Sequence, residues 1–133
     1  MGRIAALLAP MMVSFPFFAL ADGEFRPLSG QEIRATLSDA KLLYLTTSAG
    51  EETAQENGIW QLFRTDGQTL YVSGDGGGAQ SWGTWFVQDG EKGGQYCSTW
   101  PPSTHATCYD VTRSDDLVKF RGTQGDTYLG WLN

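Results

Sequence analysis

The feature that most constrains the fold is a succession of short β-type segments that fills the chain after residue 40. Each segment is rich in Val, Tyr, Phe, Trp and Thr, and turn residues separate it from the next. Pairs such as Asp66-Gly67 and Asp89-Gly90 are typical of tight turns between neighbouring antiparallel strands. Strands are predicted at Lys41–Thr47, Gly58–Thr65, Thr69–Ser73, Ser81–Gln88, Gly94–Trp100, His105–Arg113, Leu117–Gly122 and Thr127–Leu132.

About eight short strands in a row predict a mostly β protein. We expect an antiparallel meander that forms a small barrel or sandwich, with one short N-terminal helix over an end or an edge. A membrane-spanning barrel is the rival interpretation. It is disfavoured because most of the predicted strands are shorter than the roughly 9–11 residues that a membrane strand needs.

The short helix is indicated by a capping box at Ser29-Gly30-Gln31-Glu32. In such a box the serine hydroxyl accepts the amide of Glu32, and the Glu32 carboxylate accepts the amide of Ser29. Leu28 and Ile33 have the spacing of a hydrophobic staple around the cap. The helix is expected to end near Ser38 or Asp39, and a helix this short must be held by packing onto a larger element.

The first 21 residues have the layout of a secretory signal peptide. Arg3 supplies the positive charge, an apolar stretch follows, and Ala19-Leu20-Ala21 is a small-x-small cleavage sequence. Two prolines interrupt the apolar stretch, whereas a membrane anchor needs about 20 unbroken apolar residues. We therefore expect a signal peptide at residues 1–21, one domain at residues 22–133, and a location in the periplasm or outside the cell.

The charge of the chain disfavours two classes of partner. The full sequence has nine Lys and Arg against fifteen Asp and Glu, a net charge of −6, and loss of Arg3 makes it −7. Nucleic-acid affinity comes mainly from Lys and Arg that neutralise phosphates, so nucleic acid is not an expected partner. An anionic membrane surface is disfavoured for the same reason, and no stable membrane insertion is expected after signal cleavage.

Two cysteines, Cys97 and Cys108, predict one disulfide, because an even number of cysteines in an exported chain is typical of an oxidising compartment. If the two residues face each other on adjacent strands, opposed residue numbers sum to 205. Tyr96 then faces Tyr109, Trp100 faces His105, and residues 101–104 form the turn. The prolines of this turn fix φ and donate no hydrogen bond to a ladder.

Side chains alternate across a strand, so Tyr96, Trp100, His105 and Tyr109 share one face of this hairpin. Such an aromatic face either packs as core or lines a ligand cavity or contact patch. In the second case these four residues and Trp85 are the candidate binding residues. Trp82 and Trp85 lie on opposite faces of their strand, so one of them is expected to point inward.

No catalytic residue, metal ligand set or cofactor motif is identified. His105 is the only histidine, and the sequence contains no G-x-S-x-G. Zinc sites need three or four Cys or His ligands. The glycine-rich stretch from Gly74 to Gly78 lacks the Lys-Ser/Thr of a phosphate loop, and no calcium-loop pattern occurs. We expect no enzyme activity and no cofactor.

The sequence resembles small exported proteins of alphaproteobacteria that are grouped as a domain of unknown function. The resemblance covers most of residues 22–133 and implies a Gram-negative periplasm, but it implies no activity. It rests on Leu28-Ser29-Gly30-x-Glu32-Ile33, Asp66-Gly67, Gly83-x-Trp85-x-Val87-x-Asp89-Gly90, Tyr96-Cys97-x-x-Trp100 and Cys108-Tyr109-x-Val111.

The expected function is that of a non-enzymatic periplasmic binding or interaction module, for a small apolar ligand or an envelope protein. One alternative is a cell-envelope hydrolase with two carboxylates in a groove. The other is an inhibitor that presents the predicted loops Ser48–Asn57 or Gly74–Gln80 to an envelope enzyme. The carboxylates available to a hydrolase are Asp89, Glu91, Asp110, Asp115 and Asp116.

Signal cleavage is expected after Ala21. The intact mass of the exported protein should correspond to a chain that starts at Asp22, because Ala-Leu-Ala is followed directly by polar residues. An exported chain that retains Met1 contradicts this prediction.

Overall fold

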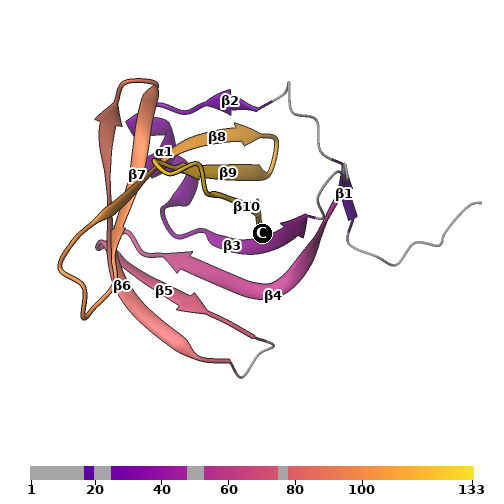
Figure 1. The fold of residues 1–133 in the computed structure, drawn as a ribbon, viewed down its shortest axis with the longest axis horizontal. Helices are drawn as coiled ribbons and strands as arrows, with labels where there is room; N and C mark the ends of the chain where they lie inside the picture. Colours follow the sequence, from indigo (N-terminus) through magenta and orange to yellow (C-terminus); the bar gives the residue numbers. More distant parts are fainter. Residues whose placement is uncertain (1–16, 20–24, 48–52, 75–77) are drawn as a thin grey trace, which may run out of the picture.

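The computed structural model describes residues 17–19, 25–47, 53–74 and 78–133. The elements in these ranges follow one another along the chain (Figure 1). They are β1 (Phe17–Ala19), β2 (Arg26–Pro27), α1 (Gly30–Leu37), β3 (Lys41–Thr47), β4 (Thr53–Phe63), β5 (Gln68–Val72), β6 (Gln80–Gly90), β7 (Gly93–Thr99), β8 (Thr107–Ser114), β9 (Leu117–Gly122) and β10 (Thr127–Leu132).

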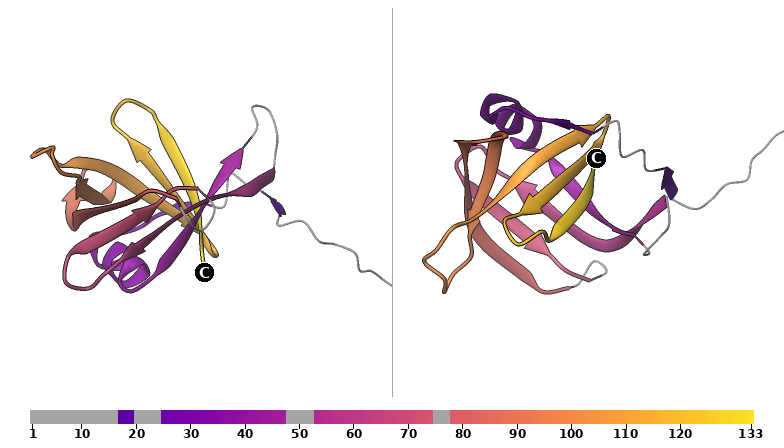
Figure 2. Two further views of the ribbon diagram at one scale, coloured as in Figure 1. Left: turned by 90° about the horizontal axis from the view of Figure 1, so that it is seen from below. Right: turned by 45° about the horizontal axis from the view of Figure 1, so that its top comes forward.

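Strands β3 to β10 form a closed antiparallel barrel of eight strands (Figures 1 and 2). Each strand pairs with the next along the chain, and β10 closes the barrel by pairing with β3. The predicted meander is therefore confirmed, and the barrel is the architecture observed. Outside it, β1 pairs with β4, and β2 pairs with β8.

Three strands, β3, β9 and β10, have the predicted bounds, whereas β4 begins earlier than predicted. The predicted loop Ser48–Asn57 is wrong over residues 53–57, and residues 48–52 lie outside the described residues. The first part of β4 pairs with the end of β3, through Thr47↔Ala54 and Leu45↔Glu56. Its polar side chains are largely exposed, so the sequence has no apolar alternation there to indicate a strand.

Helix α1 lies between β2 and β3 and contacts β6 and β7 at one end of the barrel (Figure 1). The predicted capping box is present: the Glu32 amide donates to Ser29 Oγ at 3.1 Å, and the Ser29 amide donates to Glu32 Oε1 at 2.9 Å. A glycine at position 94 permits this docking, because a Cβ there would lie 2.4 Å from the backbone nitrogen of Gly30.

The hydrophobic core fills the helix end of the barrel. Leu28, Ile33 and Leu37 are at most 1% exposed and belong to one buried cluster with inward-facing residues of the strands. Those residues are Leu42, Phe63, Trp85, Tyr96, Val111, Val118 and Phe120. This end of the barrel is therefore closed by apolar packing. As expected, Trp85 points inward, whereas Trp82 on the other face of β6 is 50% exposed.

The disulfide joins Cys97 of β7 to Cys108 of β8, with the two Cα atoms 4.0 Å apart. The predicted register holds from Gln95↔Asp110 through Tyr96↔Tyr109 to Ser98↔Thr107. The bridge lies on the face opposite Tyr96, so it ties the two strands together from outside the barrel. In the chain-entropy model a bridge across a loop of this length stabilises by about 3 kcal/mol.

The register prediction is wrong beyond Ser98, because Trp100 and His105 do not pair. Residues 100–106 form a longer connection than the predicted four-residue turn. Two prolines in it supply no amide for a ladder. The Trp100 indole instead donates to Ser98 Oγ at 3.0 Å, while His105 is exposed.

Replacing Ser29 with Ala should lower the free energy of unfolding by about 0.5–2 kcal/mol through loss of the cap bond. The control is Ser38→Ala at the other end of α1, expected to change stability by less than about 0.5 kcal/mol. Both are measured by urea denaturation monitored by circular dichroism. Equal stability of Ser29→Ala and wild type would show that the cap does not hold α1 on the barrel.

Candidate functional site

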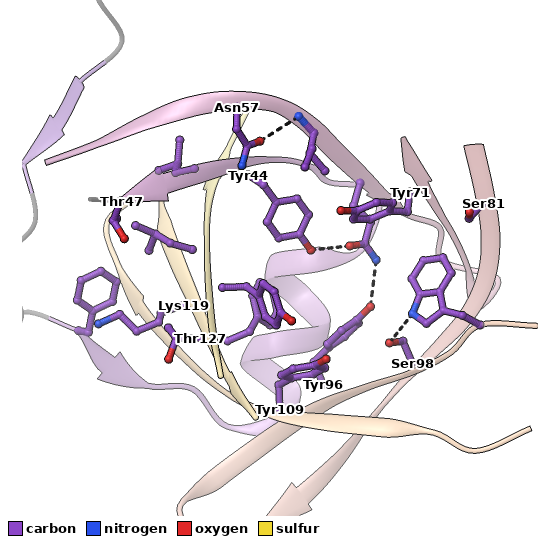
Figure 3. A pocket seen from close by; sticks show the side chains of 18 of the residues that line it. Tyr44, Thr47, Asn57, Tyr71, Ser81, Tyr96, Ser98, Tyr109, Lys119 and Thr127 are labelled. Atoms are coloured by element: carbon purple, nitrogen blue, oxygen red, sulfur yellow. Dashed lines mark hydrogen bonds between the residues drawn. The ribbon is translucent and has the colours of Figure 1, made fainter. Parts of the chain in front are cut away.

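A cavity of about 700 Å³ lies at the end of the barrel away from α1 (Figure 3). Its exposed rim residues, among them Thr47, Ser81 and Thr127, come from the strand ends opposite the helix. The lining residues are Phe25, Tyr44, Leu45, Thr47, Asn57, Ile59, Gln61, Tyr71, Ser81, Tyr96, Ser98, Trp100, Pro101, Tyr109, Lys119, Phe120, Thr127, Tyr128 and Leu129.

All five tyrosines of the chain line this cavity. They come from five strands, β3, β5, β7, β8 and β10, and each occupies an inward position of its strand. Figure 3 shows the rings of Tyr44 and Tyr71 on one wall and those of Tyr96 and Tyr109 on the other. The cavity wall is thus aromatic, with phenol hydroxyls as its most frequent polar group.

The side-chain amide of Gln61 forms the polar centre of the cavity. Gln61 is 2% exposed, and its Oε1 accepts a hydrogen bond from the Tyr44 hydroxyl at 2.5 Å. Its Nε2 donates one hydrogen bond to Thr69 Oγ1 at 2.8 Å and another to the Tyr96 hydroxyl at 3.0 Å. Both amide hydrogens are therefore used. The Thr69 hydroxyl in turn donates to the carbonyl of Leu62 at 2.7 Å. This network fixes the directions of Tyr44 and Tyr96.

Trp100 is seated at the cavity by three neighbours. Its indole donates to Ser98 Oγ, and its ring contacts that of Tyr71 edge-on with centroids 6.1 Å apart. Gly83 of β6 leaves the space for the ring, because a Cβ there would lie 2.7 Å from the indole Cε3. The sequence pattern Gly83-x-Trp85 thus has one residue that accommodates Trp100 and one that fills the core.

Tyr96 connects the cavity to the core. Its ring lies 5.6 Å from Phe63 and 5.4 Å from Phe120 in edge-to-face contacts, and 6.3 Å from Tyr109 in a stacked one, between ring centroids. Such contacts each add about 0.5–1.5 kcal/mol beyond the burial of area. Contacts between aromatic rings therefore hold the lining in place, so its side chains are not free to move as they would be at an open surface.

Burial raises the pKa of four of the tyrosines. Desolvation is the main cause for Tyr44, Tyr71, Tyr96 and Tyr109, and it raises the pKa of Tyr96 to about 12 although hydrogen bonds to Ser98 and Gln61 act against it. Neighbouring tyrosines raise the pKa of Tyr44 further. At physiological pH these hydroxyls are neutral and serve as hydrogen-bond donors or acceptors.

Part of the lining lies on the outside of the barrel. Lys119 pairs with Leu129, whereas the inward Phe120 pairs with Tyr128, so Lys119 and Leu129 face outward. The Lys119 ammonium lies 4.2 Å from the centroid of the Phe25 ring. The cavity thus continues from the barrel interior onto an outer groove beside Phe25.

The structure separates the five residues singled out from the sequence. Tyr96, Trp100 and Tyr109 line the cavity. Trp85 is 6% exposed in the core, where its indole donates to the carbonyl of Arg64 at 2.9 Å, and it is not part of the lining. His105 is exposed in the connection after β7 and lies outside the lining.

Four important lining residues were not identified from the sequence: Tyr44, Gln61, Tyr71 and Tyr128. A signal existed for Gln61, because it lies between Ile59 and Phe63 on one face of a predicted strand, and an amide among apolar inward positions needs internal partners. The tyrosines carry no comparable local signal, since a tyrosine suits either face of a strand.

The carboxylates considered for hydrolysis, Asp89, Glu91, Asp110, Asp115 and Asp116, are not lining residues of the cavity. Asp110, for example, accepts the side-chain amide of Gln95 at 3.1 Å on the outer face of β8. In the described ranges no three His, Cys, Asp or Glu side chains are grouped so that they could hold a metal ion. No helix of the described residues has the length and apolar character to span a membrane.

The chain matches no protein-family model, no curated protein and no solved structure. The functional argument therefore rests on the geometry of the cavity.

The tyrosine pKa values predict how stability depends on pH. The unfolded chain loses tyrosine protons near pH 10, whereas the folded chain retains them at Tyr44, Tyr71, Tyr96 and Tyr109 until higher pH. Because the folded state then binds more protons, the free energy of unfolding should fall as pH rises from about 10 towards 12.

The check is a phenolate absorbance titration alongside denaturation at each pH. Most tyrosines should ionise above the ordinary range while the near-ultraviolet circular dichroism is native. If all five titrate together near pH 10 in the folded protein, the cavity wall is not desolvated.

Proposed function

We propose that this protein is a non-enzymatic binding module that holds one small, largely apolar molecule in its barrel. The observation that carries the proposal is the cavity of about 700 Å³ with all five tyrosines and Trp100 in its wall. Pockets for small ligands are typically about 300–1,000 Å³ and mostly apolar, with a few placed polar groups. Barrels of eight strands have room for about one small ligand.

The arrangement of the two ends supports this proposal. Helix α1 and the core residues fill one end, and the aromatic cavity occupies the other. A ligand would enter at the rim formed by Thr47, Ser81 and Thr127 and stop at the Gln61 network. The wall is preformed, because ring contacts and hydrogen bonds already hold it, so binding costs little side-chain ordering.

The place of action we propose is the periplasm or the extracellular space. The signal-like residues 1–21 and the Cys97–Cys108 disulfide support it, since disulfides persist in oxidising compartments. A hydrolase is a weaker proposal, because the carboxylates considered for it are outside the cavity. An inhibitor is also weaker, since residues 53–57 of the first predicted loop belong to β4 and Gln80 of the second begins β6; residues 75–77 of that second loop lie outside the described residues.

A fluorescence titration tests the proposal. Trp100 is the one tryptophan among the lining residues, so a bound apolar probe should change its emission in a saturable way. The change should be lost in Trp100→Phe. The matched control is Trp82→Phe, which removes an indole from the outer face of β6 and should leave the response in place.

The absence of a saturable response to a panel of neutral apolar probes and envelope lipid extracts would contradict the proposal. Contact with an envelope protein would then be the better account. The exposed pair Trp82 and Phe86 on the outer face of β6 offers an apolar surface for it.

A further inference from the structure

The interior of the cavity contains many hydrogen-bonding groups but no charged one. Phenol hydroxyls, the Gln61 amide and the Ser98 hydroxyl supply its polar atoms. Among the described residues that line it, none is Asp or Glu, and Lys119 is the one Lys or Arg. The charge of the ligand therefore depends on where Lys119 lies.

Lys119 lies outside the barrel wall. Its strand neighbours Val118 and Phe120 are buried core residues, so alternation directs Lys119 outward, beside Leu129 and over the Phe25 ring. Figure 3 shows Lys119 well apart from Tyr44, Tyr71 and Tyr96. An anion among the tyrosines would have no cation beside it, and burying an unpaired charge is costly.

An acidic neighbour makes an anion still less favourable. The carboxylate of Asp126, at the turn before β10, lies close enough to Tyr109 to raise the pKa of its hydroxyl, and it would repel a second negative charge beside that ring. This end of the barrel thus favours an uncharged molecule.

The direction of the hydrogen bonds identifies a donor for the ligand. The Tyr44 hydroxyl donates a hydrogen bond to Gln61 Oε1, so its hydrogen is not available to a ligand. The Tyr96 hydroxyl oxygen accepts a hydrogen bond from Gln61 Nε2, and its hydrogen bond with Ser98 lowers the pKa of Tyr96, as expected where the serine donates, so the Tyr96 hydrogen is left to be donated. Tyr96 is thus the tyrosine of this network that can offer a proton to an acceptor atom in the cavity.

We propose that the cavity selects an uncharged, ring-containing molecule with a hydrogen-bond acceptor, and that the hydroxyl of Tyr96 positions it by donating to that acceptor. The ring fits the aromatic walls, where stacked and edge-on contacts between rings already predominate. This inference rests on the proposed function and adds the chemical class of the ligand.

Charge selectivity is tested with two fluorescent dyes of one skeleton. N-phenyl-1-naphthylamine is neutral, and 8-anilinonaphthalene-1-sulfonate adds a sulfonate to the same rings. The neutral dye should bind the full chain more than about tenfold tighter, because the sulfonate would be buried without a cation. Equal binding overturns the charge selectivity and leaves the proposed function standing. Binding of neither dye overturns both.

Tighter binding of the sulfonate dye, lost in Lys119→Met, would assign an anionic ligand to the outer groove and overturn the inference. A dye preference that is unchanged in Lys119→Met supports it. These outcomes separate the chemistry of the ligand from the existence of a binding cavity.

The role of Tyr96 is tested with a second pair of probes in competition with the neutral dye. 2-Acetylnaphthalene has a carbonyl acceptor, and 2-isopropylnaphthalene has nearly the same shape without one. Wild type should prefer the ketone by about 3- to 10-fold, the range for one neutral hydrogen bond. Tyr96→Phe should lose this preference and still bind the hydrocarbon.

Retained binding of the hydrocarbon shows that Tyr96→Phe is folded and that its cavity is intact. If this variant keeps the preference for the ketone, Tyr96 is not the donor. If it binds neither probe, two further measurements separate loss of the fold from loss of binding: the melting temperature of Tyr96→Phe, and the binding of both probes to Tyr96→Leu. A native melting temperature with no binding assigns Tyr96 to the packing of the cavity and overturns its role as donor.

Discussion

The hydrogen bonds of the Gln61 amide are the constraint on which the interior of the barrel depends. One side chain on β4 bonds to Tyr44 on β3, Thr69 on β5 and Tyr96 on β7. The first two partners are on adjacent strands, whereas Tyr96 is reached across the interior. A buried amide that lacks a hydrogen-bond partner costs about 1–3 kcal/mol of folding stability. Gln61 and its three partners therefore hold fixed positions relative to one another. The network divides the barrel into an apolar core towards α1 and an aromatic cavity towards the rim.

The cavity exists because the helix can fill only one end of the barrel. Ile33 and Leu37 of α1 enter the interior together with Leu28, which precedes the helix, and the close approach at Gly94 lets the helix sit directly on β7. At the other end the inward positions carry tyrosines, whose hydroxyls require polar neighbours when they are desolvated. The open space beside the rings leaves room for such polar neighbours. A fully packed phenylalanine core would instead exclude both water and ligand.

The sequence predicted the local structure well and the interior poorly. The capping box of α1, the bounds of β3, β9 and β10, and the Tyr96↔Tyr109 register each follow from residues close together in the chain or tied by one disulfide. Whether the interior is open depends on closure between β3 and β10, which are about as far apart in the sequence as the barrel allows. No local pattern specifies that closure.

The same limit explains the individual errors at the site. The sequence predicts that Trp100 pairs with His105. In the structure its indole instead occupies the space beside Gly83 and donates a hydrogen bond to Ser98 Oγ, which places it at the cavity. Trp85 has the same aromatic character and lies in the core instead. The two residues differ in their position along the barrel axis: Trp85 packs in the core cluster with the residues of α1, and Trp100 lies at the cavity. A position along the axis can be assigned only when all eight strands are aligned, because it depends on the stagger of the whole barrel. The distribution of charge follows the same division: the chain has a net charge of −6, and no Asp or Glu of the described residues lines the cavity. An acidic exterior lowers the local concentration of anions, and an uncharged interior offers them no counter-ion. The field outside the barrel and the chemistry inside it therefore select against the same class of molecule.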